Sequence, residues 1–75
     1  MENQQLQAAT EWMKSLSPQE FKKEALKAKK LCQEHNLITK LELLDIKRNY
    51  PDKVSSKLAQ LAMLKAYLYR QHQGE

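Results

Sequence analysis

Cys32 and His35 are the side chains best suited to covalent or metal chemistry, because they lie three positions apart. On a helix this spacing puts both on one face, where they could form a cysteine–histidine nucleophile or half of a metal site. A structural zinc site needs four ligands, and His72 is the only other cysteine or histidine. No third group that would orient His35 stands out. We therefore expect Cys32 to be a small buried side chain, and we predict no enzyme, metal site or cofactor site.

Lysines give the segment 18–35 a second kind of chemistry, the binding of anionic groups. Five lysines fall close together there, at Lys22, Lys23, Lys27, Lys29 and Lys30. Glutamates lie among them at helical spacing, so that Glu20 could pair with Lys23 and Glu24 with Lys27. Taken alone, this segment is therefore typical of a solvated face of mixed charge.

The segment from Lys53 to Gln73 is basic without such compensation, since it contains no acidic residue. Between Leu58 and Tyr69 it is also apolar over most of a helix circumference. Such a helix either is the central helix of its domain, with lysines reaching water, or meets a membrane or a partner helix. The predicted contact surface combines both segments and comprises Lys22, Lys23, Lys27, Lys30, Lys53, Lys57, Lys65, Tyr67, Tyr69 and Arg70.

Two short stretches, LSPQEF at 16–21 and ITKLEL at 38–43, mark where the helices that carry these residues begin. In each stretch a hydroxyl residue is followed three positions later by a glutamate, which is the pattern of a capping box. Ser17 and Glu20 form the first predicted box, and Thr39 and Glu42 form the second. Apolar residues flank both boxes as hydrophobic staples, so we assign both stretches an architectural role.

The composition of the whole chain is that of an all-α protein, because it contains one glycine and two prolines and is rich in good helix formers. We predict a single helical domain, residues 1–75, folded as a compact bundle of four helices, or of five if the region of Tyr50 adds a turn. The first two helices are expected at residues 3–15 and 18–35, and the third should begin at residue 40 and end near Arg48 or Asn49. The fourth should begin at a cap formed by Asp52 or Ser55 and end near Gln71, with fraying from His72 onward.

Helical spacing also predicts which faces are buried. The second expected helix should bury Phe21, Ala25, Ala28 and Cys32, with Leu26 and Leu31 widening that face. The third carries two apolar stripes, Leu37, Leu41 and Leu44 in one and Leu43, Ile46 and Tyr50 in the other. Two stripes predict wide burial, or burial against two different neighbours.

The single cysteine excludes a disulfide within the chain and favours a reducing compartment. The first residues lack the basic start and apolar run of a signal peptide, and no apolar stretch approaches the ~20 residues that span a bilayer. We therefore expect a cytoplasmic protein that is peripheral to the membrane if it contacts one. The net charge of +4 suits weak attraction to an anionic partner. A homo-oligomer also stays open, because small domains gain stability by association.

Residues 18–49 could mimic a helix-turn-helix, with a turn around Asn36. The reading helix would carry Lys47 and Arg48, but Glu42 and Asp45 would oppose the phosphates of nucleic acid. A DNA-binding regulator is therefore the alternative. The leading hypothesis is a small non-enzymatic binding or adaptor protein that contacts an anionic membrane surface or a partner helix.

The layout of the chain resembles the small bacterial secretion-activating proteins called Pas factor. The resemblance lies in Glu11-Trp12-Met13, the SPQEF start, the Tyr50-Pro51-Asp52 break and the long helix of leucine, alanine and tyrosine that follows. It implies a saposin-like arrangement of four or five helices, association with lipid and a link to protein secretion. The chain departs from ordinary saposins in having one cysteine in place of disulfide-forming pairs, which leaves helix packing as the basis of that analogy.

Overall fold

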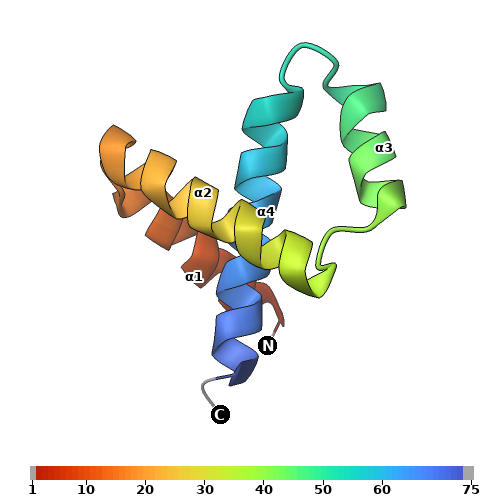
Figure 1. Cartoon of the computed structure of the whole chain (residues 1–75). Coiled ribbons are helices and arrows are strands. Elements are labelled where there is room, and N and C mark those ends of the chain that lie inside the picture. Colours follow the sequence, from red (N-terminus) through yellow and green to blue (C-terminus); the bar gives the residue numbers. More distant parts are fainter. Residues whose placement is uncertain (1, 74–75) are drawn as a thin grey trace.

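Four helices make up the structure, a computed structural model that describes residues 2–73 (Figure 1). They are α1 (Glu2–Ser15), α2 (Pro18–His35), α3 (Lys40–Asn49) and α4 (Val54–Gln73). This confirms the all-α, four-helix prediction. The alternative with a fifth helix is wrong for the described residues, because residues 51–53 form only a turn, in which the Lys53 N–H donates to the Tyr50 carbonyl at 3.0 Å.

Both predicted capping boxes are present. The Ser17 hydroxyl accepts the Glu20 N–H at 3.2 Å, and the Glu20 carboxylate accepts the Ser17 N–H at 3.0 Å. Thr39 and Glu42 repeat this exchange at 3.1 and 3.0 Å. Asn36 ends α2 in the left-handed conformation, with φ 52° and ψ 46°, which asparagine tolerates better than most residues. These local signals therefore fix where α2 begins and ends and where α3 begins.

The ends of α4 differ from the prediction. The Lys53 carbonyl accepts the N–H of Lys57, so the residue before the helix is Lys53, and neither Asp52 nor Ser55 caps it. At the other end α4 continues through His72 to Gln73, because no helix terminator precedes Gly74 in the sequence. The helix thus ends two residues beyond the predicted Gln71, and the expectation for residues 74–75 lies outside the described residues.

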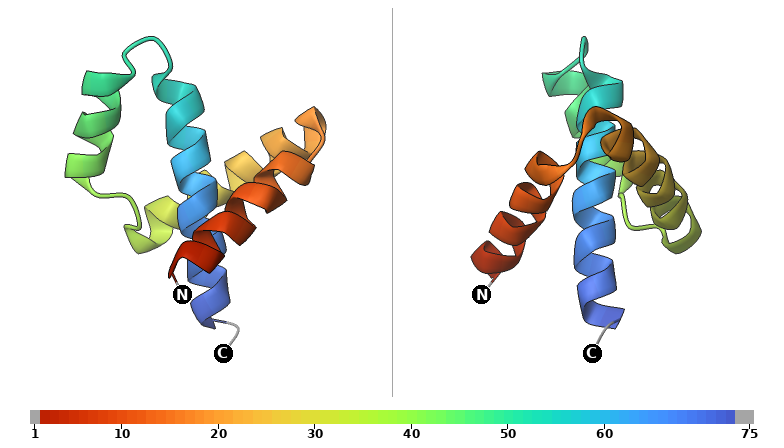
Figure 2. Two further views of the ribbon diagram at one scale, coloured as in Figure 1. Left: turned by 180° about the vertical axis from the view of Figure 1, so that it is seen from behind. Right: turned by 90° about the vertical axis from the view of Figure 1, so that its left-hand side faces the viewer.

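The central element is α4, which packs against each of the other three helices. The views in Figure 2 show α1 and α2 crossing α4 on opposite sides, while α3 runs beside its first half. The main contact joins α2 to α4 through small side chains, which let two backbones approach closely. The buried residues of the core are Ala9, Ala25, Ala28, Cys32, Ile46, Ala59, Ala62, Met63 and Ala66.

Three leucines that were expected to widen the buried faces lie at the surface instead. Leu26 is 69% exposed, because α2 contacts α4 through the narrow stripe of Ala25, Ala28 and Cys32. On α3, Leu41 is 79% and Leu44 is 59% exposed. Only the side of α3 that faces α4 is covered, so Leu41 and Leu44 lie at the surface, whereas Leu37 of the same predicted stripe packs against the core.

Candidate functional site

The exposed side of α2 gathers positive charge around one apolar side chain. Leu26, itself largely exposed, lies one helical turn from Lys22 on one side and from Lys30 on the other. We call this surface the basic face of α2. It comprises the exposed residues Lys22, Lys23, Leu26, Lys27 and Lys30, with half-exposed Lys29.

Within residues 2–73 the glutamates of α2 form no ion pairs with the lysines of this face. Glu20 is engaged in its capping box, where hydrogen bonds from the N-cap residue lower the pKa of its carboxyl below the ordinary value. Glu24 is half-buried, and its Oε2 is shielded from water without a hydrogen-bond partner. Glu34 is exposed near the C-terminal end of the helix. Among residues 2–73 no lysine of α2 lies within ion-pair distance of a carboxylate, so the expected pairing along α2 is wrong.

The aromatic and basic residues predicted on α4 point to three different neighbours. Lys65 pairs with Glu42 of α3 at 2.9 Å. Tyr67 packs on Trp12 of α1 with ring centroids 5.5 Å apart. Tyr69 stacks on His35 of α2, with ring centroids 4.7 Å apart and an angle of 26° between the ring planes. These three residues of α4 therefore hold the helices together and do not share one surface.

The remaining basic residues of α4 are spread along its length. Lys53 and Arg70 are exposed, and seventeen residues of helix place them about 25 Å apart. Lys57 is half-buried, with its Nζ 4.7 Å from the centre of the Tyr50 ring. The structure thus brings together the predicted lysines of α2 and separates the predicted residues of α4.

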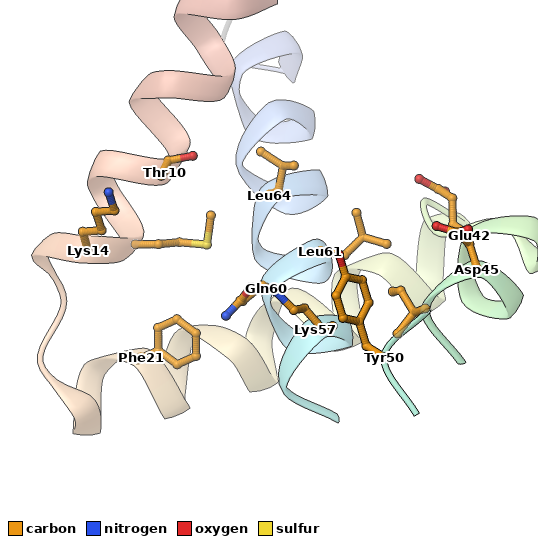
Figure 3. A pocket seen from close by; sticks show the side chains of 12 residues that line it. Thr10, Lys14, Phe21, Glu42, Asp45, Tyr50, Lys57, Gln60, Leu61 and Leu64 are labelled. Atoms are coloured by element: carbon orange, nitrogen blue, oxygen red, sulfur yellow. The ribbon is translucent and has the colours of Figure 1, made fainter. Parts of the chain in front are cut away.

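An open groove that sequence reasoning missed lies between α1 and α3, with α4 as its floor (Figure 3). Its volume is about 590 Å³. We call it the α1–α3 groove. It is lined by Thr10, Met13, Lys14, Phe21, Glu42, Asp45, Ile46, Tyr50, Lys57, Gln60, Leu61 and Leu64. The one sequence signal for this groove was that α4 is apolar around more of its circumference than its alanine contact with α2 requires.

Cys32 and His35 have separate partners in spite of their spacing. The Cys32 thiol is buried and donates to the Ala62 carbonyl at 3.5 Å, and burial raises the pKa of this thiol. His35 is exposed and lies against Tyr69, whose hydroxyl is 3.4 Å from Nδ1. Across the part of the chain that is described, no three histidine, cysteine or carboxylate side chains converge as a metal site would require.

None of the helices within residues 2–73 combines the length and apolar composition needed to cross a membrane. Comparisons of the chain with protein families, curated proteins and solved structures find no match. The basic face of α2 and the α1–α3 groove are therefore the two candidate sites of this protein.

Proposed function

We propose that this protein is a non-enzymatic binding protein that associates reversibly with anionic membrane surfaces through the basic face of α2. One observation carries the proposal: lysines without ion-pair partners surround an exposed leucine. Lysines attract the anionic headgroups, and Leu26 can enter the boundary between headgroups and acyl chains. The lysine stems can lie along the same boundary while their ammonium groups stay in water.

The expected strength of this association is modest. A lysine near an anionic membrane contributes about 1 kcal/mol, so Lys22, Lys23, Lys27 and Lys30 together give about 4 kcal/mol. Covering the exposed part of Leu26 adds about 1 kcal/mol, since full burial of a leucine gives about 1.5–3 kcal/mol. A total near 5 kcal/mol corresponds to dissociation constants of about 0.1–1 mM. Binding of this strength is reversible and sensitive to salt.

Leu26 also favours a membrane over nucleic acid as the anionic partner. A phosphate backbone would attract the same lysines but offers no apolar environment to an exposed leucine. The outward side of α3, the helix that would read DNA, presents Leu41 and Leu44. DNA binding is therefore the alternative that the experiment must separate from membrane association.

A role in protein export extends the proposal, and it rests on the resemblance of the sequence to Pas factor. In that role the protein would be an adaptor that holds a partner at the membrane surface. Such an adaptor needs a second binding surface, distinct from the face that contacts lipid.

Vesicle co-sedimentation tests the proposed function. At low salt the protein should sediment with vesicles that contain phosphatidylglycerol but not with pure phosphatidylcholine vesicles, and added salt should release it. A gel-shift titration with duplex DNA in the same low-salt buffer forms the second arm. Absence of sedimentation with anionic vesicles at low salt contradicts the proposal, and a DNA shift in its place favours the alternative.

A further inference from the structure

We propose that the α1–α3 groove binds an amphipathic helix of a partner protein, with acidic residues along the edges of its apolar face. This site is separate from the basic face of α2. Its residues come from all four helices and from the start of the α3–α4 turn, so it exists only in the folded domain.

The floor and walls of the groove suit the apolar face of a short helix. Leu61 and Leu64 form the apolar part of the floor on α4, and Met13, Phe21 and Ile46 contribute apolar surface from the other helices. Lys57 and Leu64, at the ends of the α4 portion, are seven residues apart, which corresponds to about 10 Å of helix. That length accommodates about two turns of a partner, enough for apolar anchors at i, i+3 or i+4, and i+7.

The charges around the groove select an acidic partner. Glu42 is already engaged, since it accepts the Thr39 N–H at 3.0 Å and pairs with a lysine of α4 at 2.9 Å. Asp45 accepts a hydrogen bond from the Asn49 side chain at 2.8 Å. Glu42 is thus balanced by a cation, whereas Asp45 keeps its negative charge because the Asn49 amide is neutral. With Glu42 balanced, Lys14 and Lys57 against Asp45 leave the lining with a net charge of +1.

Lys14 and Lys57 are the two cations of the lining, and within residues 2–73 neither has an ion-pair partner. Lys57 lies over the Tyr50 ring, a contact that leaves its full positive charge in place. Figure 3 shows Lys14 and Lys57 projecting from two different helices around the apolar floor. Two cations on separate helices can pair with two carboxylates along the edge of a partner helix. A single acyl chain would offer them only one anionic headgroup.

A second copy of this chain would be a poor occupant. Its most exposed apolar helix surfaces are those around Leu26 and around Leu41 and Leu44. The former is flanked by the lysines of α2, and the latter by Lys47 and Arg48, which outnumber Asp45 there. Either surface would bring positive charge toward Lys14 and Lys57, which opposes binding.

Two labelled synthetic helical peptides of eighteen residues provide the test, with fluorescence anisotropy as the measurement at low salt. Both carry the same leucine face, and one has glutamates while the other has lysines along its edges. The acidic peptide should bind more tightly by about tenfold, the effect of two partly exposed ion pairs. The double variant Lys14→Glu, Lys57→Glu should reverse this preference.

The matched control is Lys22→Glu, Lys23→Glu on the basic face of α2, which lowers the net charge of +4 by the same four units. It should keep the preference for the acidic peptide and lose vesicle binding, whereas the groove variant should keep vesicle binding. Each proposal can therefore fail without the other. Circular dichroism confirms that both variants are folded.

Three results would overturn the proposal of a partner helix. The first is an equal loss of affinity for the acidic peptide in the groove variant and in the matched control, because it would show an unspecific attraction between charges. The second is a dimer in light scattering that Lys14→Glu, Lys57→Glu dissociates, which makes a second copy the occupant. The third is binding of decanoate at this groove with no binding of either peptide, which makes a single-chain amphiphile the ligand.

Discussion

Two neighbouring residues of α4 should respond very unequally to a change of size, although both are apolar. Ala62 is 0% exposed at the crossing of α2 and α4, and its carbonyl accepts the Cys32 thiol. Leu61 is half-exposed and forms part of the floor of the α1–α3 groove. We therefore compare Ala62→Leu, which enlarges the crossing, with Leu61→Ala, which reduces the groove floor.

The magnitudes follow from burial. Ala62→Leu adds a bulky side chain between two close backbones, and overpacking of this kind lowers the free energy of unfolding by about 3 kcal/mol. A chain of 75 residues has a total free energy of unfolding of about 4–11 kcal/mol, so this loss is large. The midpoint of thermal unfolding should fall by about 12–24 °C, at about 4–8 °C per kcal/mol. Leu61→Ala removes contacts that are only partly formed, and it should lower the free energy by about 1 kcal/mol.

Urea unfolding followed by circular dichroism gives both free energies, provided that the slope with denaturant is unchanged. Gln60→Leu is the control for Ala62→Leu, because position 60 is exposed on the same helix and accepts the added carbons without a clash. A fall of several kcal/mol in the free energy of unfolding for Leu61→Ala, together with no change for Ala62→Leu, would refute the placement of Ala62 in the core and of Leu61 at the groove.

Three further predictions concern the capping boxes and the thiol. Ser17→Ala and Thr39→Ala should each lower stability by about 1 kcal/mol in urea unfolding, and an unchanged midpoint would contradict the caps. Hydrogen bonds lower the pKa of Glu20 and Glu42, so their contribution is complete above the ordinary carboxyl pKa and is lost as pH falls through the lower folded pKa. The double change of both glutamates to glutamine should therefore reduce the loss of stability measured between pH 5 and pH 3, and an unchanged pH dependence would contradict this account. Cys32, buried and with a raised pKa, should react with a thiol reagent at pH 8 at least about tenfold more slowly in the folded than in the urea-unfolded chain, and equal rates would contradict its burial.

Local sequence signals predicted much of the fold, and the reason is that they act over a few residues. Ser17, Thr39 and Asn36 determine helix ends through hydrogen bonds to nearby backbone, so their types and spacing are sufficient. The start of α4 was missed because Lys53 precedes the helix, and a lysine side chain has no oxygen that could accept a helix N–H and mark the start in the sequence.

The candidate surfaces depend on contacts between distant residues, and they were harder to predict. Helical periodicity placed Leu26 near the buried face of α2, but the width of that face is set by how closely α4 approaches. The pairing of Tyr67 with Trp12 and of Tyr69 with His35 removed aromatic residues from the predicted surface. The α1–α3 groove arises from the separation of two helices that are far apart in the chain, which no local pattern encodes.

The most direct test of the central claim compares the affinity of two variants for phosphatidylglycerol vesicles at low salt. One variant changes Lys22, Lys23, Lys27 and Lys30 to glutamine, and the other makes the same change at Lys14, Lys53, Lys57 and Arg70. Both lower the net charge from +4 to zero by removing four positive charges. We predict that the first variant binds the vesicles about a thousandfold more weakly, below detection, because each lysine contributes about 1 kcal/mol. The second variant should still sediment with the vesicles. Equal losses in the two variants, or full binding by the first, would contradict a membrane contact through the basic face of α2.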